Sequence, residues 1–363
     1  MHDQYFAPEV WNGSRRRLAE SVADAGTVWP VELWRGIAAW MVVYAHYWSG
    51  ADSSWPLLRF TFTGVDLFFV LSGFVFAPYF FGRPLLAGAF ALRRFFRIYP
   101  AYLLALLLYF GMKYSDGHAL LYWWQHLVFA YLQSREMAFY YNPVFWSLPS
   151  EVEFYLLLPL LAKFCRGRLP HFAVLLAAAL LMRAVIGYAS DTQAQNHAYI
   201  WMHHLPGMLV EFLLGACAWS LSDRGLSGRV RALLLATGLA LWLFLAACFA
   251  QAGDAGVNAS LARGQLSWLA ALSFASMVAA TVGPWKQAPA ALVKAALWSG
   301  RLSYGSYLFH IAALRLLEPY GKTLGPFDVT IPAALLTIVM AWLSYLFWEN
   351  PWRRFGRSVA ARC

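Results

Sequence analysis

Long apolar segments recur from one end of the chain to the other, and they constrain its fold more than any other feature. A helix needs about 20 apolar residues to cross the hydrocarbon core of a bilayer. Ten segments meet or approach this length: 29–49, 60–81, 97–113, 146–165, 171–188, 202–221, 231–250, 264–282, 300–318 and 329–348. Only 13% of the residues are charged, whereas a soluble protein has roughly 25%. The sequence therefore predicts an all-α, multi-pass bundle of about ten transmembrane helices.

The distribution of basic residues predicts the orientation of this bundle. With ten spans, 20 of the 28 Lys and Arg residues fall in the two tails and the alternate loops that would face the cytoplasm, and seven fall outside. Cytoplasmic loops carry such an excess, so we expect both termini in the cytoplasm. The net charge of +10 is explained in this way and does not indicate a nucleic-acid partner. Segment 119–132 is too short to span, and we expect an interfacial or re-entrant helix on the outer side.

Three regions follow from this topology. We expect a cytoplasmic N-terminal segment over 1–28 without a cleavable signal, one membrane domain over 29–350, and a basic cytoplasmic tail over 351–363. The four cysteines form no CxxC pair, so we expect neither a metal site nor a disulfide framework.

Arg35 and His46 lie in the first apolar segment, eleven residues apart. On a helix this spacing returns to nearly the same face, with a rise of ~16 Å. Ionisable groups inside a membrane helix are costly and are usually functional. Alternatively, Arg35 extends to the cytoplasmic interface, where Glu32 can pair with it, and His46 is a buried histidine with satisfied hydrogen bonds.

Asp66 lies among aromatic residues in the second apolar segment. A carboxylate there is expected to be neutral or paired, and Arg35 and His46 on the neighbouring helix are its obvious partners. Pairing with the imidazole would orient the ring and increase its basicity. A polar clamp between helices, without a catalytic duty, is an equal alternative.

Arg93, Arg94 and Arg97 precede or begin the third span. The guanidinium groups of Arg94 and Arg97 share a helix face, and arginine binds phosphate in a bidentate manner. A helix N-terminus also favours anions. On charge alone, ordinary positive-inside anchoring is the favoured interpretation of the same three residues.

Glu151 and Glu153 begin the fourth span, which the topology places near the outer surface. Being two residues apart, they point in different directions, so only one can face a given site. They are either solvent-facing carboxylates at a helix N-terminus or members of a site enclosed by aromatic residues. Weaker candidates are Glu211, His310, Arg315 and Glu349.

Taken together, these segments resemble the acyltransferase-3 family of bacterial membrane O-acyltransferases, in the stand-alone form without an SGNH domain. The resemblance extends from about Val31 to Arg354. Six elements carry it in the family's order and spacing: Trp34-Arg35-Gly36 followed by His46, Gly64 to Phe74, the pair Arg94 and Arg97, Trp146 to Tyr155, Ser303 to His310, and Glu349 to Arg354.

The chain departs from the family pattern at two places. Many members have a second glutamate where this chain has Val152, and Glu153 takes the position of a glutamine, so no catalytic role is carried over to Glu153. Met208 stands where many members have arginine, which leaves the role of Glu211 open.

The resemblance implies transfer of an acyl group, usually acetyl, from cytoplasmic acyl-CoA to a sugar hydroxyl in a cell-surface or exported glycan or glycolipid. It implies the bacterial inner (plasma) membrane as the location. The roles that it implies are phosphate binding by Arg94, Arg97 and Arg93, and catalysis by His46 as general base with the assistance of Asp66. Arg35 or a helix dipole would stabilise the oxyanion, and Glu151 would position the acceptor or pass on the proton. Ser147, Tyr155 and His310 are expected to bind substrate.

Other classes of protein remain open on the sequence. Ten spans with buried ionisable residues also suit a proton-coupled transporter or a glycolipid flippase. A non-catalytic subunit of a glycan-assembly complex is a third reading. Binding of acetyl-CoA that depends on Arg94 and Arg97 separates the enzyme from the transporter. The acceptor, the length of the acyl group and the oligomeric state are not determined.

Overall fold

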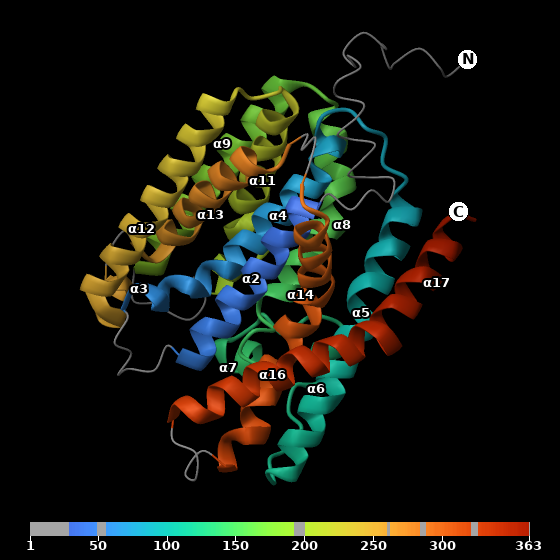
Figure 1. The fold of residues 1–363 in the computed structure, drawn as a ribbon. Helices are drawn as coiled ribbons and strands as arrows, with labels where there is room; N and C mark the ends of the chain where they lie inside the picture. The colour runs from blue at the N-terminus through green and yellow to red at the C-terminus, as the bar shows by residue number, and fades with distance from the viewer. Residues whose placement is uncertain are drawn as a thin grey trace.

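The computed structural model of the chain describes residues 29–48, 56–191, 200–259, 262–283, 288–320 and 326–362. All regular structure in these residues is helical, and most of the long helices run side by side (Figure 1). The all-α prediction is therefore confirmed. The predicted segment 1–28 lies outside the described residues, as do Arg15, Arg16, Arg17, Lys286 and Lys322 of the charge distribution.

The elements follow in chain order. They are α2 (Trp29–Trp48), α3 (Pro56–Arg59), η2 (Phe60–Thr63), α4 (Gly64–Phe80), α5 (Ala87–Ser115), α6 (Trp123–Leu127), α7 (Arg135–Phe139), α8 (Ser147–Cys165), α9 (Leu169–Asp191), α11 (Leu205–Asp223), α12 (Gly228–Ala259), α13 (Ala262–Thr281), α14 (Ala290–Leu317), η3 (Glu318–Tyr320), α16 (Pro326–Ser344), η4 (Tyr345–Glu349) and α17 (Asn350–Ala360).

Six helical stretches of the described chain are long and apolar enough to span a membrane. They are Leu57–Phe80, Ala87–Ser115, Leu169–Ala189, Ile200–Asp223, Gly228–Gln251 and Val329–Ala360. The protein is thus a multi-pass membrane protein. The remaining four predicted spans correspond to α2, α8, α13 and α14, which fall short of the same apolarity or length. Ten spans and cytoplasmic termini remain predictions.

The helices α2 and α14 pack closely against each other at two glycines. A Cβ atom on Gly36 would lie 2.5 Å from Cβ of Ser299, and one on Gly300 would lie 2.6 Å from Cβ of Glu32. Glycine at these positions lets two helices with polar side chains approach closely in the interior. The two helices therefore meet with the polar side chains of Glu32 and Ser299 at their contact.

The helix α4 packs on α11 through a similar contact. A Cβ atom on Gly73 would lie 1.7 Å from the carbonyl oxygen of Phe212, and one on Gly215 would lie 1.9 Å from that of Val70. Asp66 precedes Gly73 by seven residues, which is about two helical turns. The side chain of Asp66 is therefore directed toward α11.

The helix α5 begins at Ala87, ten residues before the predicted third span begins. Arg94 and Arg97 consequently lie ~10 and ~15 Å along the helix rather than at its N-terminus. The expectation that a helix N-terminus contributes to binding an anion there is wrong. Residues 88–96 continue the helix although they are less apolar, because their aromatic side chains pack inside the bundle, for example Phe90 against Phe76.

Two further segments differ from the sequence-based expectations. In the segment 119–132, only Trp123–Leu127 is helical, and the rest consists mainly of turns with a positive φ at Tyr122 and Phe129. At the other end, α16, η4 and α17 form one continuous helical stretch. Figure 1 shows α17 beside α5, and the ring of Trp352 stacks on that of Phe96 with centroids 5.9 Å apart.

Candidate active site

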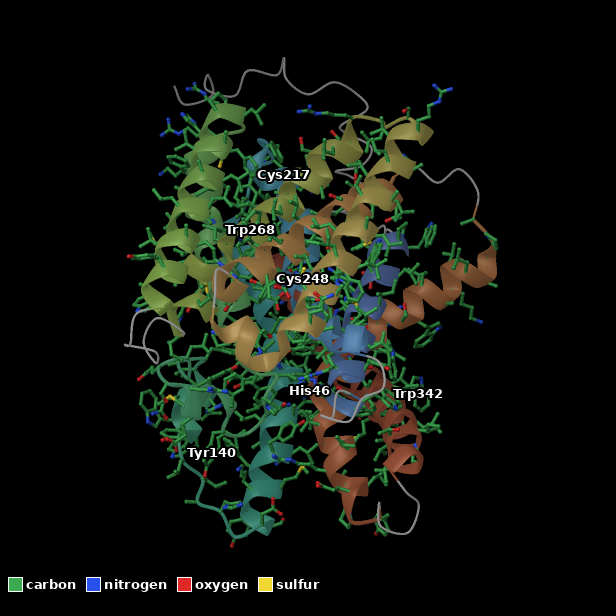
Figure 2. All side chains as sticks on the ribbon, turned by 90° about the vertical axis from the view of Figure 1, so that its left-hand side faces the viewer. His46, Tyr140, Cys217, Cys248, Trp268 and Trp342 are labelled. Carbon is green, nitrogen blue, oxygen red and sulfur yellow. The ribbon has the colours of Figure 1, made fainter. Side chains whose placement is uncertain are left out.

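Arg35 and His46 lie on the single uninterrupted helix α2, as predicted. The helix geometry separates them by ~16 Å along its axis. Arg35 forms the predicted ion pair with Glu32. Figure 2 shows His46 on α2, nearer to the end of the bundle that carries Tyr140 than to the end that carries Cys217. The two residues therefore mark two levels of the bundle.

The side chain of Arg35 faces a cavity between α2, α4, α5, α8 and α14, which we call the arginine cavity. Arg94 and Arg97 of α5 line the same cavity. Its other polar lining residues are Ser72 of α4, Ser147, Glu151 and Tyr155 of α8, and Ser303, Tyr304 and Tyr307 of α14. The structure thus brings together six of the residues singled out in the sequence: Arg35, Arg94, Arg97, Ser147, Glu151 and Tyr155.

Arg94 and Arg97 have no carboxylate within ion-pair distance among the described residues. Nε of Arg94 is buried without a hydrogen-bond partner. The Arg94 guanidinium lies over the rings of Phe76 and Phe90, at 5.0 and 5.7 Å from their centroids. Both arginine side chains are half-buried, and unpaired positive charge away from water is costly. The arginine cavity therefore carries positive charge that an anion would balance.

Arg353 of α17 extends this positive charge. Its guanidinium interacts electrostatically with Arg35, Arg97 and Glu349. Glu349 ends the π-helical turn η4 and accepts a hydrogen bond from Ser344 at 3.1 Å. Sequence reasoning did not select Arg353 as a site residue. The sequence pattern could have identified it, because Arg353 lies in the last of the six elements that carry the family resemblance, Glu349 to Arg354.

Glu151 lies in the arginine cavity, not in the expected place near the outer surface and away from the arginines. It accepts hydrogen bonds from Ser72, at 3.1 Å, and from Tyr155. The reason is that α8 begins inside the bundle, where Ser147 and Ser150 are buried. Glu151 is thus held where it can neighbour a ligand of the arginines.

Ser147 and Tyr307 both line the arginine cavity. The hydroxyl of Tyr307 donates to the carbonyl of Val144 at 2.6 Å and therefore accepts from Ser147, also at 2.6 Å. His310 follows Tyr307 by three residues, which is a rise of ~4.5 Å. His310 therefore lies about one helical turn from a residue that lines the cavity, but it is not itself a lining residue.

His46 contacts His310 of α14. Nδ1 of His46 lies 3.3 Å from Nε2 of His310, and the ring centroids are 5.0 Å apart. His310 is fully buried, whereas the side chain of His46 is exposed. Among the described residues, Nε2 of His46 has no hydrogen-bond partner. One imidazole nitrogen is therefore free to take a proton from a bound substrate.

Asp66 contacts neither Arg35 nor His46, so the expectation of these partners is wrong. Its carboxyl group interacts electrostatically with that of Glu211, which forms an ion pair of 3.4 Å with Arg183. The glycine contact between α4 and α11 directs Asp66 to this side. The cluster joins α4, α9 and α11 and matches the polar-clamp reading.

The remaining candidates are placed as follows. Arg93 does not line the arginine cavity. Glu153 accepts from the backbone N–H of Leu205 at 2.7 Å and contacts Nδ1 of His204 at 2.5 Å. Nε2 of His204 lies 2.9 Å from the carbonyl oxygen of Leu132. Both nitrogens of His204 and both oxygens of Glu153 therefore have hydrogen-bond partners, which is typical of a structural role.

Comparisons with known proteins identify the family of the chain. No solved structure matches the chain. Nodulation protein 10 of Rhizobium leguminosarum bv. viciae is 26% identical to it, in a match that covers 91% of this chain and 95% of that protein. The acyltransferase-3 model, described as an acyltransferase domain, matches residues 30–349. The chain therefore belongs to the acyltransferase-3 family, and the protein is a membrane acyltransferase.

Proposed function

We propose that the protein transfers an acyl group, most simply acetyl, from acyl-CoA to a hydroxyl of a sugar in a cell-surface or exported glycan or glycolipid. The observation that carries this proposal is the unpaired positive charge of Arg94 and Arg97 in a cavity lined by Tyr307, three residues before the His310 that contacts His46. A transporter has no need of a polyanion site at a fixed distance from an imidazole.

The arginine cavity matches the polyanionic end of acyl-CoA. Guanidinium groups bind phosphate oxygens in a bidentate manner. Arg94, Arg97 and Arg35 would hold phosphates, with Arg353 adding positive charge beside them. The pantetheine arm would then run past Ser147 and Tyr307 toward His46. This assignment places the bound nucleotide on the side of Arg35, which the charge distribution assigns to the cytoplasm.

The transfer itself needs a base beside the thioester. Nε2 of His46 would accept the proton of the acceptor hydroxyl as its oxygen attacks the thioester carbonyl. The carbon–sulfur bond then breaks, the ester remains on the sugar, and the imidazolium returns the proton to the departing thiolate. Atoms and charge balance without a metal ion. The ion pair of Arg35 with Glu32 is ~16 Å away along α2, so Arg35 serves phosphate binding rather than the oxyanion.

Glu151 takes a different role from the one expected on the sequence. Because it lies among the arginines and accepts hydrogen bonds from Ser72 and Tyr155, it would orient these groups around the donor. Asp66 holds α4 on α11 through Glu211 and has no direct part in the transfer. The acceptor would approach His46 from the side of the bundle that carries Tyr140.

This function is tested by mass spectrometry of the surface glycans of bacteria that carry the protein in their own inner membrane. A strain without the gene is compared with strains that carry the wild-type chain, His46→Gln or Arg93→Gln. We expect the wild-type chain and Arg93→Gln to restore one acyl group per repeat, and His46→Gln to restore none. Identical glycans with and without the gene would refute the proposed acceptor class, and restoration by His46→Gln would refute the proposed base.

A further inference from the structure

The fully buried ring of His310 has a hydrogen-bonding arrangement that bears directly on His46. Nδ1 of His310 lies 3.1 Å from the carbonyl oxygen of Ser306. Because a carbonyl only accepts, Nδ1 of His310 carries the hydrogen. Nε2 of His310 is then left with a lone pair, and this atom faces Nδ1 of His46 at 3.3 Å.

The same reasoning fixes the tautomer of His46. Its Nδ1 lies 2.9 Å from the carbonyl oxygen of Val42 and must carry a hydrogen. That hydrogen is shared between two acceptors, the Val42 carbonyl and Nε2 of His310. The lone pair of His46 is therefore on Nε2, the nitrogen that has no partner among the described residues.

The backbone of α14 around His310 is held by side chains from other elements. Tyr47 of α2 donates to the carbonyl of His310 at 2.8 Å. Tyr109 of α5 and Asn142 both donate to the carbonyl of Leu308, at 3.0 and 3.2 Å. Three parts of the chain thus fix the position from which the imidazole of His310 projects. A ring supported in this way has a defined geometry before substrate binds.

We propose that His310 is a positioning residue that holds His46 in the tautomer needed for proton transfer and accepts a stronger hydrogen bond when His46 becomes an imidazolium. This proposal rests on the proposed function, with His46 as the base. The role is that of the third member of a hydrolytic triad, with a neutral imidazole in place of the carboxylate. It differs from the expectation on the sequence, in which His310 binds substrate.

Two variants of His310 separate positioning from packing. His310→Phe keeps an aromatic ring but has no acceptor for Nδ1–H of His46. His310→Gln keeps an amide oxygen at about the reach of Nε2. A hydrogen bond to a charged group contributes a factor of about 10 to 100 to a rate. We expect kcat to fall by about this factor in His310→Phe, with KM for acetyl-CoA unchanged, and His310→Gln to recover much of the loss.

The tautomer of His46 is read independently by ¹⁵N NMR of the purified protein labelled at histidine. We expect a protonated Nδ1 and an unprotonated Nε2 in the wild type, and a mixture of tautomers in His310→Phe. Wild-type kcat in His310→Phe, or equal losses in the Phe and Gln variants, would overturn the positioning role. Full transfer by His46→Gln would instead overturn the proposed function, so the two failures are distinguishable.

Discussion

Replacing Arg94 and Arg97 by glutamine removes two half-buried positive charges and keeps long polar side chains. Each arginine is expected to make at least one charge-assisted hydrogen bond to a phosphate. Such a bond contributes about 1.5–3 kcal/mol, which corresponds to a factor of about 10 to 150 in Kd. We therefore expect each single variant to bind acetyl-CoA about 10 to 100 times more weakly, and the double variant to bind more weakly than either.

The same substitutions are expected to act in the opposite direction on the protein without donor. Because neither guanidinium has a carboxylate partner among the described residues, its removal relieves an uncompensated charge. The free energy of unfolding of the ligand-free double variant should be unchanged or higher. In the wild type, a donor concentration of 100 times Kd adds about 2.7 kcal/mol of stability, and this gain should nearly vanish in the double variant.

Binding of labelled acetyl-CoA and thermal unfolding in detergent measure both effects on one preparation. Arg93→Gln is the matched control, because Arg93 belongs to the same basic turn but does not line the arginine cavity. It should retain wild-type affinity and the full stabilisation by donor. If the double variant binds acetyl-CoA as tightly as Arg93→Gln does, the cavity is not the anion site.

Three further changes test the packing around the site. Arg183→Met leaves the carboxyl groups of Glu211 and Asp66 without the buried cation. We expect the free energy of unfolding to fall by about 3–5 kcal/mol, which thermal unfolding measures. An unchanged unfolding midpoint would show that this cluster is dispensable. Gly73→Ala places a Cβ atom 1.7 Å from the carbonyl oxygen of Phe212, so α4 and α11 must separate. We expect a markedly lower yield of folded protein than for the control Gly88→Ala, because nothing lies within 4 Å of a Cβ atom at Gly88. Burial lowers the pKa of His126 to about 4, so the unfolded chain takes up a proton first as the pH falls. Stability should decline from about pH 6.5 down to about pH 4 by about 1.4 kcal/mol per unit, and His126→Phe should flatten this decline; equal slopes would contradict it.

The sequence was sufficient for features that depend on one helix. The spacing of Arg35 and His46 predicted their placement on one continuous helix. The spacing of Arg94 and Arg97 predicted that they share a helix face, and both line one cavity. The ion pair of Arg35 with Glu32 was also predicted, because residues three apart on a helix are neighbours.

Features that depend on which helices meet were not predictable in this way. Asp66 was assigned to Arg35 and His46 because neighbouring spans were assumed to face each other. The close glycine contact of α4 on α11 instead directs Asp66 to Glu211. A periodic pattern shows that a residue is buried, but it does not identify the helix that buries it.

The depth of Glu151 was missed for a related reason. A topology of straight spans puts the start of α8 at the outer surface. In the structure this start is buried, and Glu151 reaches the level of the arginines. The early start of α5 has the same effect on Arg94 and Arg97, which lie inside the helix. The apolarity of the sequence identifies the parts of a helix that face lipid. It misses less apolar parts of the same helix that are enclosed by other helices.

The central claim is that His46 transfers protons for a donor held in the arginine cavity. Its most direct test is acyl transfer by purified protein in liposomes, with labelled acetyl-CoA and the extracted glycan acceptor, comparing wild type with His46→Gln. The account predicts that His46→Gln binds acetyl-CoA with wild-type affinity and forms no labelled glycan. Formation of labelled glycan by His46→Gln at the wild-type rate would contradict it.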